Sequence, residues 1–232
     1  SLDRAGVILK VDVATGDRTV LMESGPYEGP SWGELGAFDR RVGYVHDVQP
    51  GPGRTLYAFA DDSYERNEMV LAIDRDTGAV ELVWTTNGLY GETTPFGFCE
   101  TTDSPYRLQL STTGFAVDPE GRVYLPFANP TQGRGILRLS ADFTSCEVVT
   151  GIGIPEATRG EGPFLSGFVQ GFTFHEGRLY AFTTAPKQFF AVDLATGDRT
   201  LLAEPAGVTP TERWARWDAG RDVWWLGGMT NG

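Results

Sequence analysis

A repeated sequence unit constrains the fold of this chain more than any other feature. The hexapeptide Ala-Thr-Gly-Asp-Arg-Thr occurs at 14–19 and again at 195–200. It belongs to a longer unit that is present four times, at 11–21, 72–83, 138–149 and 192–202. Each copy joins two apolar runs through turn-forming residues, and in three of them a glycine supplies the positive φ of a tight hairpin. We therefore expect four similar β-hairpins.

A second type of hairpin alternates with the first along the chain. Apolar and polar residues alternate on both sides of three turn sequences, at 118–121, 175–177 and 218–220, which is typical of paired strands. A fourth hairpin of this type, over 36–48, is less regular. We expect its turn at 39–41, with residues 57–59 extending or replacing one of its strands.

The order of the hairpins predicts an all-β fold, a β-propeller. The expected strands occupy 6–22, then 36–59 with 69–85, 114–127 with 135–149, 171–184 with 188–203, and finally 213–228. Four-stranded units that repeat every roughly 55–60 residues are typical of propeller blades. The lone hairpins at the two ends would pair in one shared blade and close the ring, which removes open sheet edges. We predict one domain over 1–232 with four blades, or five or more if the sequence is part of a longer chain.

The charge of the chain narrows its partners. Asp and Glu number 31 against 19 Lys and Arg, which gives a net charge of −12. Such a surface repels phosphate backbones and anionic lipids, so nucleic acid is not expected as a partner. No apolar run approaches the roughly 20 residues of a membrane helix, so membrane insertion is not expected either. The charge suits cations, protein partners, or neutral ligands such as carbohydrates and other small molecules, or it serves solubility alone.

The first-type hairpins, an apolar run followed by Asp and Ala-Thr-Gly, resemble the repeats of secreted bacterial propellers of the NHL and SMP-30-like kind. After the first of these hairpins, Glu28-Gly29-Pro30-Ser31-Trp32 resembles the opening motif of the SMP-30/gluconolactonase family. In that family the glutamate binds a divalent metal in the central channel, so the resemblance implies a metal ligand at Glu28, with calcium as the candidate ion. The family's Pro-Asp-Gly ligand context has no counterpart here. Glu161-Gly162-Pro163 repeats the start of the motif, which favours a structural role for the element.

A second resemblance concerns residues 168–180, which are similar to a segment of the plant-type glutaminyl cyclases, a family of five-bladed propellers. There the strand continues into a catalytic glutamate. In this chain Ala181, Phe182 and Thr183 occupy the matching positions. The resemblance therefore implies strand structure and not that activity.

The histidines do not indicate a catalytic site. His46 precedes Asp47, a pair that could orient a general base, but no nucleophile motif accompanies it. His175 lies in an expected turn. With only two histidines in the chain, we expect neither a serine triad nor a multi-histidine metal site.

Propeller topology predicts where a ligand would bind. The connections between blades and those between the second and third strands share one face around the channel, where acidic and aromatic residues interleave. Acidic groups beside flat apolar rings suit sugars or a cation, although a solvated acidic rim would give the same pattern. The ligand-binding candidates on this face are Glu28, Trp32, Asp61, Asp62, Asn129, Glu161 and Gln170.

The two cysteines favour export. Cys99 lies in the long irregular stretch 86–113, and Cys146 lies on an expected last strand of a blade. We predict a Cys99–Cys146 disulfide that pins this stretch to its blade, stabilising the fold by about 3–4 kcal/mol. Such bonds form in oxidising compartments.

Together these features predict an extracellular or periplasmic β-propeller that acts as a binding or scaffold module, presenting its loop-rich acidic face to a ligand or a protein partner. No complete catalytic constellation is present. One alternative is a metal-dependent hydrolase of the SMP-30/gluconolactonase type with a channel metal near Glu28. Another is a structural subunit of a larger assembly.

Overall fold

The computed structural model describes residues 7–23, 42–62, 68–85, 114–129, 133–153, 158–163, 169–184, 187–204, 212–218 and 223–228. Throughout these ranges the regular structure consists of antiparallel β-strands, with no helix. The chain divides into two compact units, Ser1–Phe96 and Gly97–Gly232.

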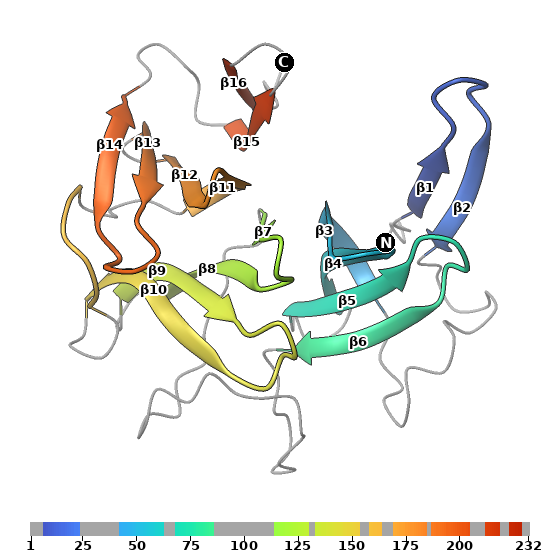
Figure 1. Ribbon diagram of the computed structural model, residues 1–232, viewed down its shortest axis with the longest axis horizontal. Coiled ribbons are helices and arrows are strands. Elements are labelled where there is room, and N and C mark those ends of the chain that lie inside the picture. The colour runs from blue at the N-terminus through green and yellow to red at the C-terminus, as the bar shows by residue number, and fades with distance from the viewer. Residues whose placement is uncertain are drawn as a thin grey trace, which may run out of the picture. The chain divides into compact units, whose positions relative to one another are not determined.

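The first unit contains one hairpin and one four-stranded sheet (Figure 1). The hairpin consists of β1 (Val7–Val11) and β2 (Arg18–Glu23). The sheet has the order β3-β4-β5-β6, with the strands β3 (Val42–Pro50), β4 (Thr55–Asp62), β5 (Glu68–Asp74) and β6 (Val80–Thr85). Ile8 and Leu21 of the hairpin pack with Leu71 and Ile73 of β5 in one hydrophobic cluster, so the hairpin covers a face of the sheet.

The turn of the first inner hairpin differs from the prediction. We expected it at 39–41, but β3 and β4 are joined by residues 51–54, and 57–59 lie within β4. The Gly51 N–H donates to the Thr55 carbonyl over 2.9 Å, Pro52 restricts φ, and Gly53 supplies a φ of +60°. The prediction was wrong because this Gly-Pro-Gly sequence is the stronger turn signal; residues 39–41 lie outside the described ranges.

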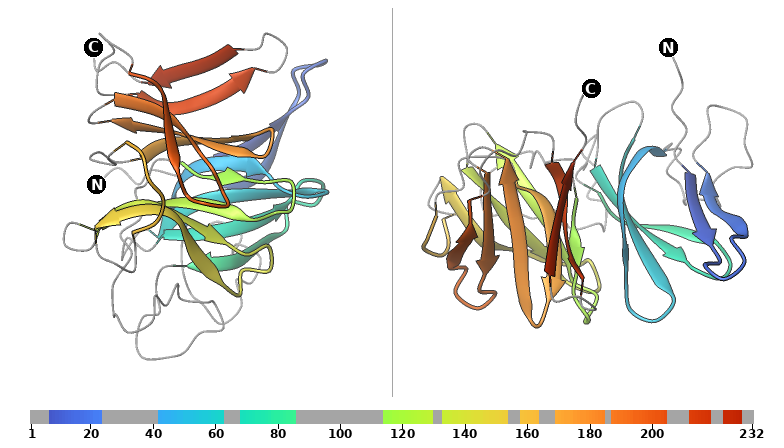
Figure 2. Two further views of the ribbon diagram at one scale, coloured as in Figure 1. Left: turned by 60° about the vertical axis from the view of Figure 1, so that its left-hand side comes forward. Right: turned by 90° about the horizontal axis from the view of Figure 1, so that it is seen from above.

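The second unit contains two four-stranded sheets and a further hairpin (Figures 1 and 2). One sheet consists of β7 (Ala116–Val117), β8 (Val123–Asn129), β9 (Gly133–Leu139) and β10 (Cys146–Gly153). The next consists of β11 (Val169–His175), β12 (Arg178–Thr184), β13 (Lys187–Val192) and β14 (Arg199–Ala203). The hairpin consists of β15 (Glu212–Asp218) and β16 (Val223–Gly228).

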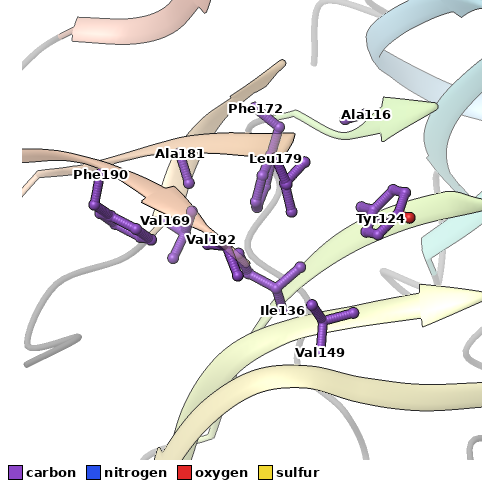
Figure 3. Packing of buried hydrophobic residues seen from close by; sticks show 10 residues of the cluster. All are labelled: Ala116, Tyr124, Ile136, Val149, Val169, Phe172, Leu179, Ala181, Phe190 and Val192. Carbon is purple, nitrogen blue, oxygen red and sulfur yellow. The ribbon is translucent and has the colours of Figure 1, made fainter. Parts of the chain in front are cut away.

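The inner edges of the sheets in the second unit lie side by side. β7 is the first strand of its sheet and contacts β11, the first strand of the next, while β11 contacts β15. Between the two four-stranded sheets, Tyr124, Ile136 and Val149 pack with Phe190 and Val192 in one buried cluster (Figure 3). Sheets stacked face to face with their first strands adjacent are arranged as propeller blades are.

The alternation of two hairpin types is confirmed. Every copy of the first type is an outer pair of strands or stands alone as β1–β2, and the second type forms the inner pairs. The register fits tight turns: His175 pairs with Arg178, and the two residues between them have positive φ, 47° at Glu176 and 73° at Gly177. The described residues show the sheets and not a closed ring, so four blades and ring closure remain predictions.

Candidate functional site

The repeated aspartates of the outer hairpins are turn caps. Oδ1 of Asp193 accepts hydrogen bonds from the N–H groups of Ala195 (2.8 Å) and Thr196 (3.0 Å), and Asp12 and Asp74 make the same contacts in their own turns. The bonds from the backbone N–H groups hold the pKa values of all three carboxyls below their usual range. Part of the acidic composition therefore stabilises turns.

The predicted binding residues fall into three groups. Glu28 and Trp32 lie outside the described residues. Asp61 and Asp62 end β4, and Asn129 ends β8, so all three lie where a second strand leads into a third. Gln170 is the second residue of β11, at the end of that sheet where β12 leads into β13. The backbone thus places Asp61, Asp62, Asn129 and Gln170 at corresponding ends of their sheets.

Glu161 lies outside the strands, beside the opposite end of the sheet β11–β14. Its carbonyl accepts a hydrogen bond from the Arg199 N–H at 2.7 Å, and its own N–H donates to Oδ1 of Asp198 at 2.7 Å. Arg199 begins β14, beside the β13–β14 turn, whereas Gln170 lies near the beginning of β11. The structure therefore separates Glu161 from Gln170 by most of the length of a strand, although the sequence analysis placed both on one face.

Arg199 forms a polar site that the sequence analysis did not single out. Its side chain is buried and extends from β14 to β10 and to residues 158–163, which we call the strap. Nε donates to the Pro163 carbonyl at 3.0 Å, and Nη1 donates to the Arg159 carbonyl at 3.2 Å and to Oγ1 of Thr150. Desolvation by burial lowers the pKa of Arg199. These contacts tie the strap to two neighbouring sheets.

Arg159 extends the same junction. Its guanidinium donates to the carbonyls of Val148 (2.8 Å) and Ala195 (3.0 Å) and to Oε2 of Glu147 (3.3 Å). The strap also needs its glycines: a Cβ on Gly162, where φ is +115°, would lie 2.0 Å from the Arg199 carbonyl oxygen. Glu161-Gly162-Pro163 therefore has a structural role in the junction between sheets, while Glu28-Gly29-Pro30 lies outside the described residues.

A buried carboxylate anchors the β7–β8 turn. Asp118 accepts hydrogen bonds from the Arg122 N–H at 2.9 Å, from Arg122 Nε at 2.6 Å and from the Tyr124 hydroxyl at 2.9 Å. Burial and this hydrogen bond raise the pKa of Tyr124 to about 12. All three donors belong to residues that follow Asp118 in this hairpin, so the arrangement stabilises the turn.

Both histidines lie in inner strands, His46 within β3 and His175 at the end of β11. The His46 ring lies 5.7 Å from the Phe59 ring, and the Asp47 carboxylate accepts hydrogen bonds from the Val48 N–H and from Nε2 of Gln49, each at 2.8 Å. His175 ends β11, with Nε2 3.7 Å from Oε1 of Glu176. Within the described ranges no group of three or more His, Cys, Asp or Glu residues could hold a metal ion. No helix in the described part of the chain is long and apolar enough to span a membrane.

The structure describes one of the two cysteines of the predicted disulfide. Cys146 begins β10, the outermost strand of its sheet, which confirms the strand expected for it. Cys99 lies outside the described residues, so the bond stays a prediction.

The comparisons define the class of fold. No protein-family model and no curated protein matches the chain. Among solved structures, a structural genomics protein of unknown function from Bacteroides thetaiotaomicron is 14% identical with a TM-score of 0.50, the match covering 81% of this chain and 39% of that protein. TolB from Acinetobacter baumannii is 10% identical with a TM-score of 0.50, covering 95% and 48%.

These likenesses show the fold alone. The structural neighbours include β-propeller-like proteins, TolB among them, which agrees with the stacked four-stranded sheets of this chain. The chain spans less than half of the length of each of the two proteins compared above. The protein thus has an all-antiparallel, β-propeller-like fold, and these likenesses assign it no activity.

Proposed function

We propose that this protein is a β-propeller binding module that presents the connection ends of its sheets to a ligand. The observation that supports this most is the distribution of roles between the two ends of each sheet. The turn ends carry capped aspartates, the Asp118 anchor and the strap, which are engaged in holding the fold together. Asp61, Asp62, Asn129 and Gln170 lie at the opposite, connection ends.

The chemistry of these residue types favours a neutral or cationic ligand. Carboxylates and amides together supply acceptors and donors that suit the hydroxyl groups of a carbohydrate or small molecule, and a net charge of −12 favours basic protein surfaces. Carbohydrate and protein ligands remain alternatives. We place the module in the extracellular or periplasmic space, since the proposed Cys99–Cys146 bond requires an oxidising compartment.

The proposed ring has four blades. β1–β2 is a hairpin of the outer type and β15–β16 a hairpin of the inner type, so the two would complete one four-stranded sheet with β16 next to β1. If the sequence is part of a longer chain, further strands would complete each hairpin instead, giving five or more blades.

Calorimetric titration tests the binding proposal. The probes are a set of neutral oligosaccharides and a hexalysine peptide, added to the wild-type chain and to two charge-matched double variants. Asp61→Asn with Asp62→Asn removes two acids from a connection end. Glu120→Gln with Glu176→Gln removes two exposed acids from the turns. We expect at least one probe to bind, and the first variant alone to weaken it about tenfold, the effect of losing one charged hydrogen bond. Failure of every probe to bind, or equal losses in both variants, would contradict the proposal.

The hydrolase alternative depends on Glu28, and the subunit alternative on contacts with other chains. No described residue favours either over the binding module. Metal binding, considered below, tests the first. Light scattering of the concentrated protein tests the second, because a stable monomer would count against an assembly.

A further inference from the structure

The strand β14 forms the outer edge of its sheet, which has the order β11-β12-β13-β14 (Figure 1). An edge strand presents backbone N–H and C=O groups on the side that has no neighbouring strand. The Asp193 N–H donates to the Asp198 carbonyl at 2.9 Å, and hydrogen-bonded pairs alternate with non-hydrogen-bonded pairs along an antiparallel ladder. With the observed register, the backbone groups of Arg199 and Leu201 therefore point away from β13.

The strap already pairs with the first of these two positions. The Arg199 N–H donates to the Glu161 carbonyl at 2.7 Å. Pro163 follows two residues later and has no N–H with which to continue a ladder. Across the described ranges no backbone group accepts a hydrogen bond from the outward N–H of Leu201. The strap thus occupies one position of the edge and leaves the next one open.

Apolar side chains border the open position. Leu201 is 41% exposed and Leu202 is 48% exposed, although Phe190, which pairs with Leu201, is fully buried. Adjacent exposed leucines beside open backbone groups are the features to which a further strand adds. Because β14 has only five residues, the matching segment is short and extended.

The charges at the two ends of β14 indicate the kind of segment. Asp198 precedes the strand and Glu204 follows its last residue, and both are exposed. If β14 of a second copy paired antiparallel around Leu201, Asp198 of one copy would lie opposite Glu204 of the other, and like charges in opposite positions destabilise a strand pair. A segment with a basic residue at each end would instead meet a carboxylate at each end.

We propose that the outer edge of β14 binds an extended, basic peptide segment of another protein by strand addition, with the backbone of that segment bonded at Leu201. Main-chain hydrogen bonds and contact with the two leucines hold the segment, and the two carboxylates select basic residues. Every residue that carries the inference belongs to the second unit. The inference goes beyond the proposed function, because it uses the edge of one sheet and requires neither the ligand nor a closed ring.

Calorimetric titration of the full chain with two peptides tests the charge requirement. One probe is the hexapeptide Lys-Val-Thr-Val-Thr-Lys with blocked termini, and the other has glutamates in place of the lysines. We expect the lysine probe to bind about tenfold more tightly, the effect of one exposed ion pair at each end. Asp198→Asn with Glu204→Gln should remove this preference, whereas Glu120→Gln with Glu176→Gln, which removes two acids elsewhere, should keep it.

Three results of this titration would overturn the proposal. They are no binding of the lysine probe, equal binding of the two probes, and equal effects of the two double variants. Light scattering adds a fourth: self-association of the wild type that Leu201→Pro abolishes would assign the edge to a second copy. Asp61→Asn with Asp62→Asn should leave binding of the lysine probe unchanged, so this inference and the proposed function fail separately.

A proline at position 201 tests whether the backbone binds the segment. Leu201→Pro removes the outward N–H, which donates nothing to β13, and Leu201→Ala truncates the same side chain but keeps that N–H. We expect the proline variant to lose binding of the lysine probe and the alanine variant to bind less than about tenfold more weakly than the wild type. Binding that survives in the proline variant would contradict the proposal.

Methylation of the probe tests the same point without any change to the protein. The lysine probe is methylated at alternate backbone nitrogens in the two possible patterns, each of which blocks the donors of one edge of the peptide. Because an added strand bonds through one edge only, we expect one pattern to abolish binding and the other to preserve it. Equal loss with both patterns, or loss with neither, would show that the peptide does not bind as a strand.

Discussion

The guanidinium of Arg199 donates a hydrogen bond to Oγ1 of Thr150 and so joins two neighbouring sheets through a buried cation. The same group donates to the carbonyls of Arg159 and Pro163. All three acceptors are uncharged, so the arginine serves to satisfy the backbone of the strap. A fold built from stacked sheets needs such contacts, because hydrogen bonds within each sheet do not hold one sheet to the next.

Removal of Arg199 tests this role. Arg199→Met keeps the length and apolar stem of the side chain but leaves buried acceptors without donors, which we expect to cost about 2–4 kcal/mol of the free energy of unfolding. Arg178→Met, at an exposed position of the same sheet, is the matched control and should change it by less than about 0.5 kcal/mol. Chemical denaturation measures both. Equal small effects would show that the strap contributes little.

The lowered pKa values of the turn-capping aspartates predict how the stability of the fold depends on pH. The pKa values of Asp12, Asp74 and Asp193 are lowered by backbone N–H groups from the ordinary 3.8. A carboxyl with a lowered folded-state pKa contributes stability that is complete above its unfolded pKa and is lost as the pH falls through the folded value. The unfolding midpoint should therefore drop as the pH falls below about 3.8.

The triple variant Asp12→Asn, Asp74→Asn, Asp193→Asn isolates this contribution. Asparagine caps the same turns without titrating, so the variant should lose less stability than the wild type between neutral pH and the acid range. Thermal unfolding recorded at a series of pH values measures the difference. Parallel curves would mean that other carboxyls cause the acid sensitivity.

The predicted Cys99–Cys146 bond has a direct mass-spectrometric test. Non-reducing digestion should release one peptide pair linked through these two residues, and iodoacetamide should label neither of them before reduction. Cys146→Ser should lower the free energy of unfolding by about 3 kcal/mol under oxidising conditions, with no further loss on adding a reductant. Two alkylated thiols in the unreduced protein would disprove the bond and remove the main support for export.

The effect of calcium on thermal stability distinguishes the binding module from the hydrolase alternative. For a module without a channel metal, we expect calcium and a chelator to leave the thermal midpoint of the wild type unchanged, and Glu28→Gln to behave in the same way. A calcium-dependent rise in the midpoint that Glu28→Gln abolishes would instead support the alternative, since a ligand that binds only the folded state raises its stability.

The outer hairpins were predictable because their determinants are local. Asp193 caps a turn whose glycine lies four residues later, and the same spacing recurs at Asp12 and Asp74. The junction between sheets was not predictable by this route. Arg18 and Arg199 occupy the same place in identical hexapeptides, yet Arg199 is buried and Arg18 is exposed, because only contacts with distant residues distinguish them.

The candidate site was likewise predictable from the sequence only in part. Propeller topology predicted that Asp61, Asp62 and Asn129 would lie in the connections between second and third strands, whereas in the structure they are the last residues of the second strands, where those connections begin. The alternation of apolar and polar residues in the strands did not predict that Glu161 would lie beside the β13–β14 turn. Its position follows from a chain reversal after β10, where Arg159 pairs with Gly151, and from the close approach of Gly160 to Gly197. Such close approaches depend on the packed sheets and not on the spacing of residues along one strand.

The proposed ring is tested most directly by nuclear Overhauser effects between its terminal strands. If the terminal hairpins share one sheet, β1 and β16 are antiparallel neighbours, and their Hα protons approach closely at alternate residue pairs. We predict Hα–Hα cross-peaks that connect Val7–Val11 with Val223–Gly228, at intensities independent of protein concentration. A complete set of cross-peaks for β1–β2 and for β15–β16, with none between β1 and β16, would contradict the four-bladed ring.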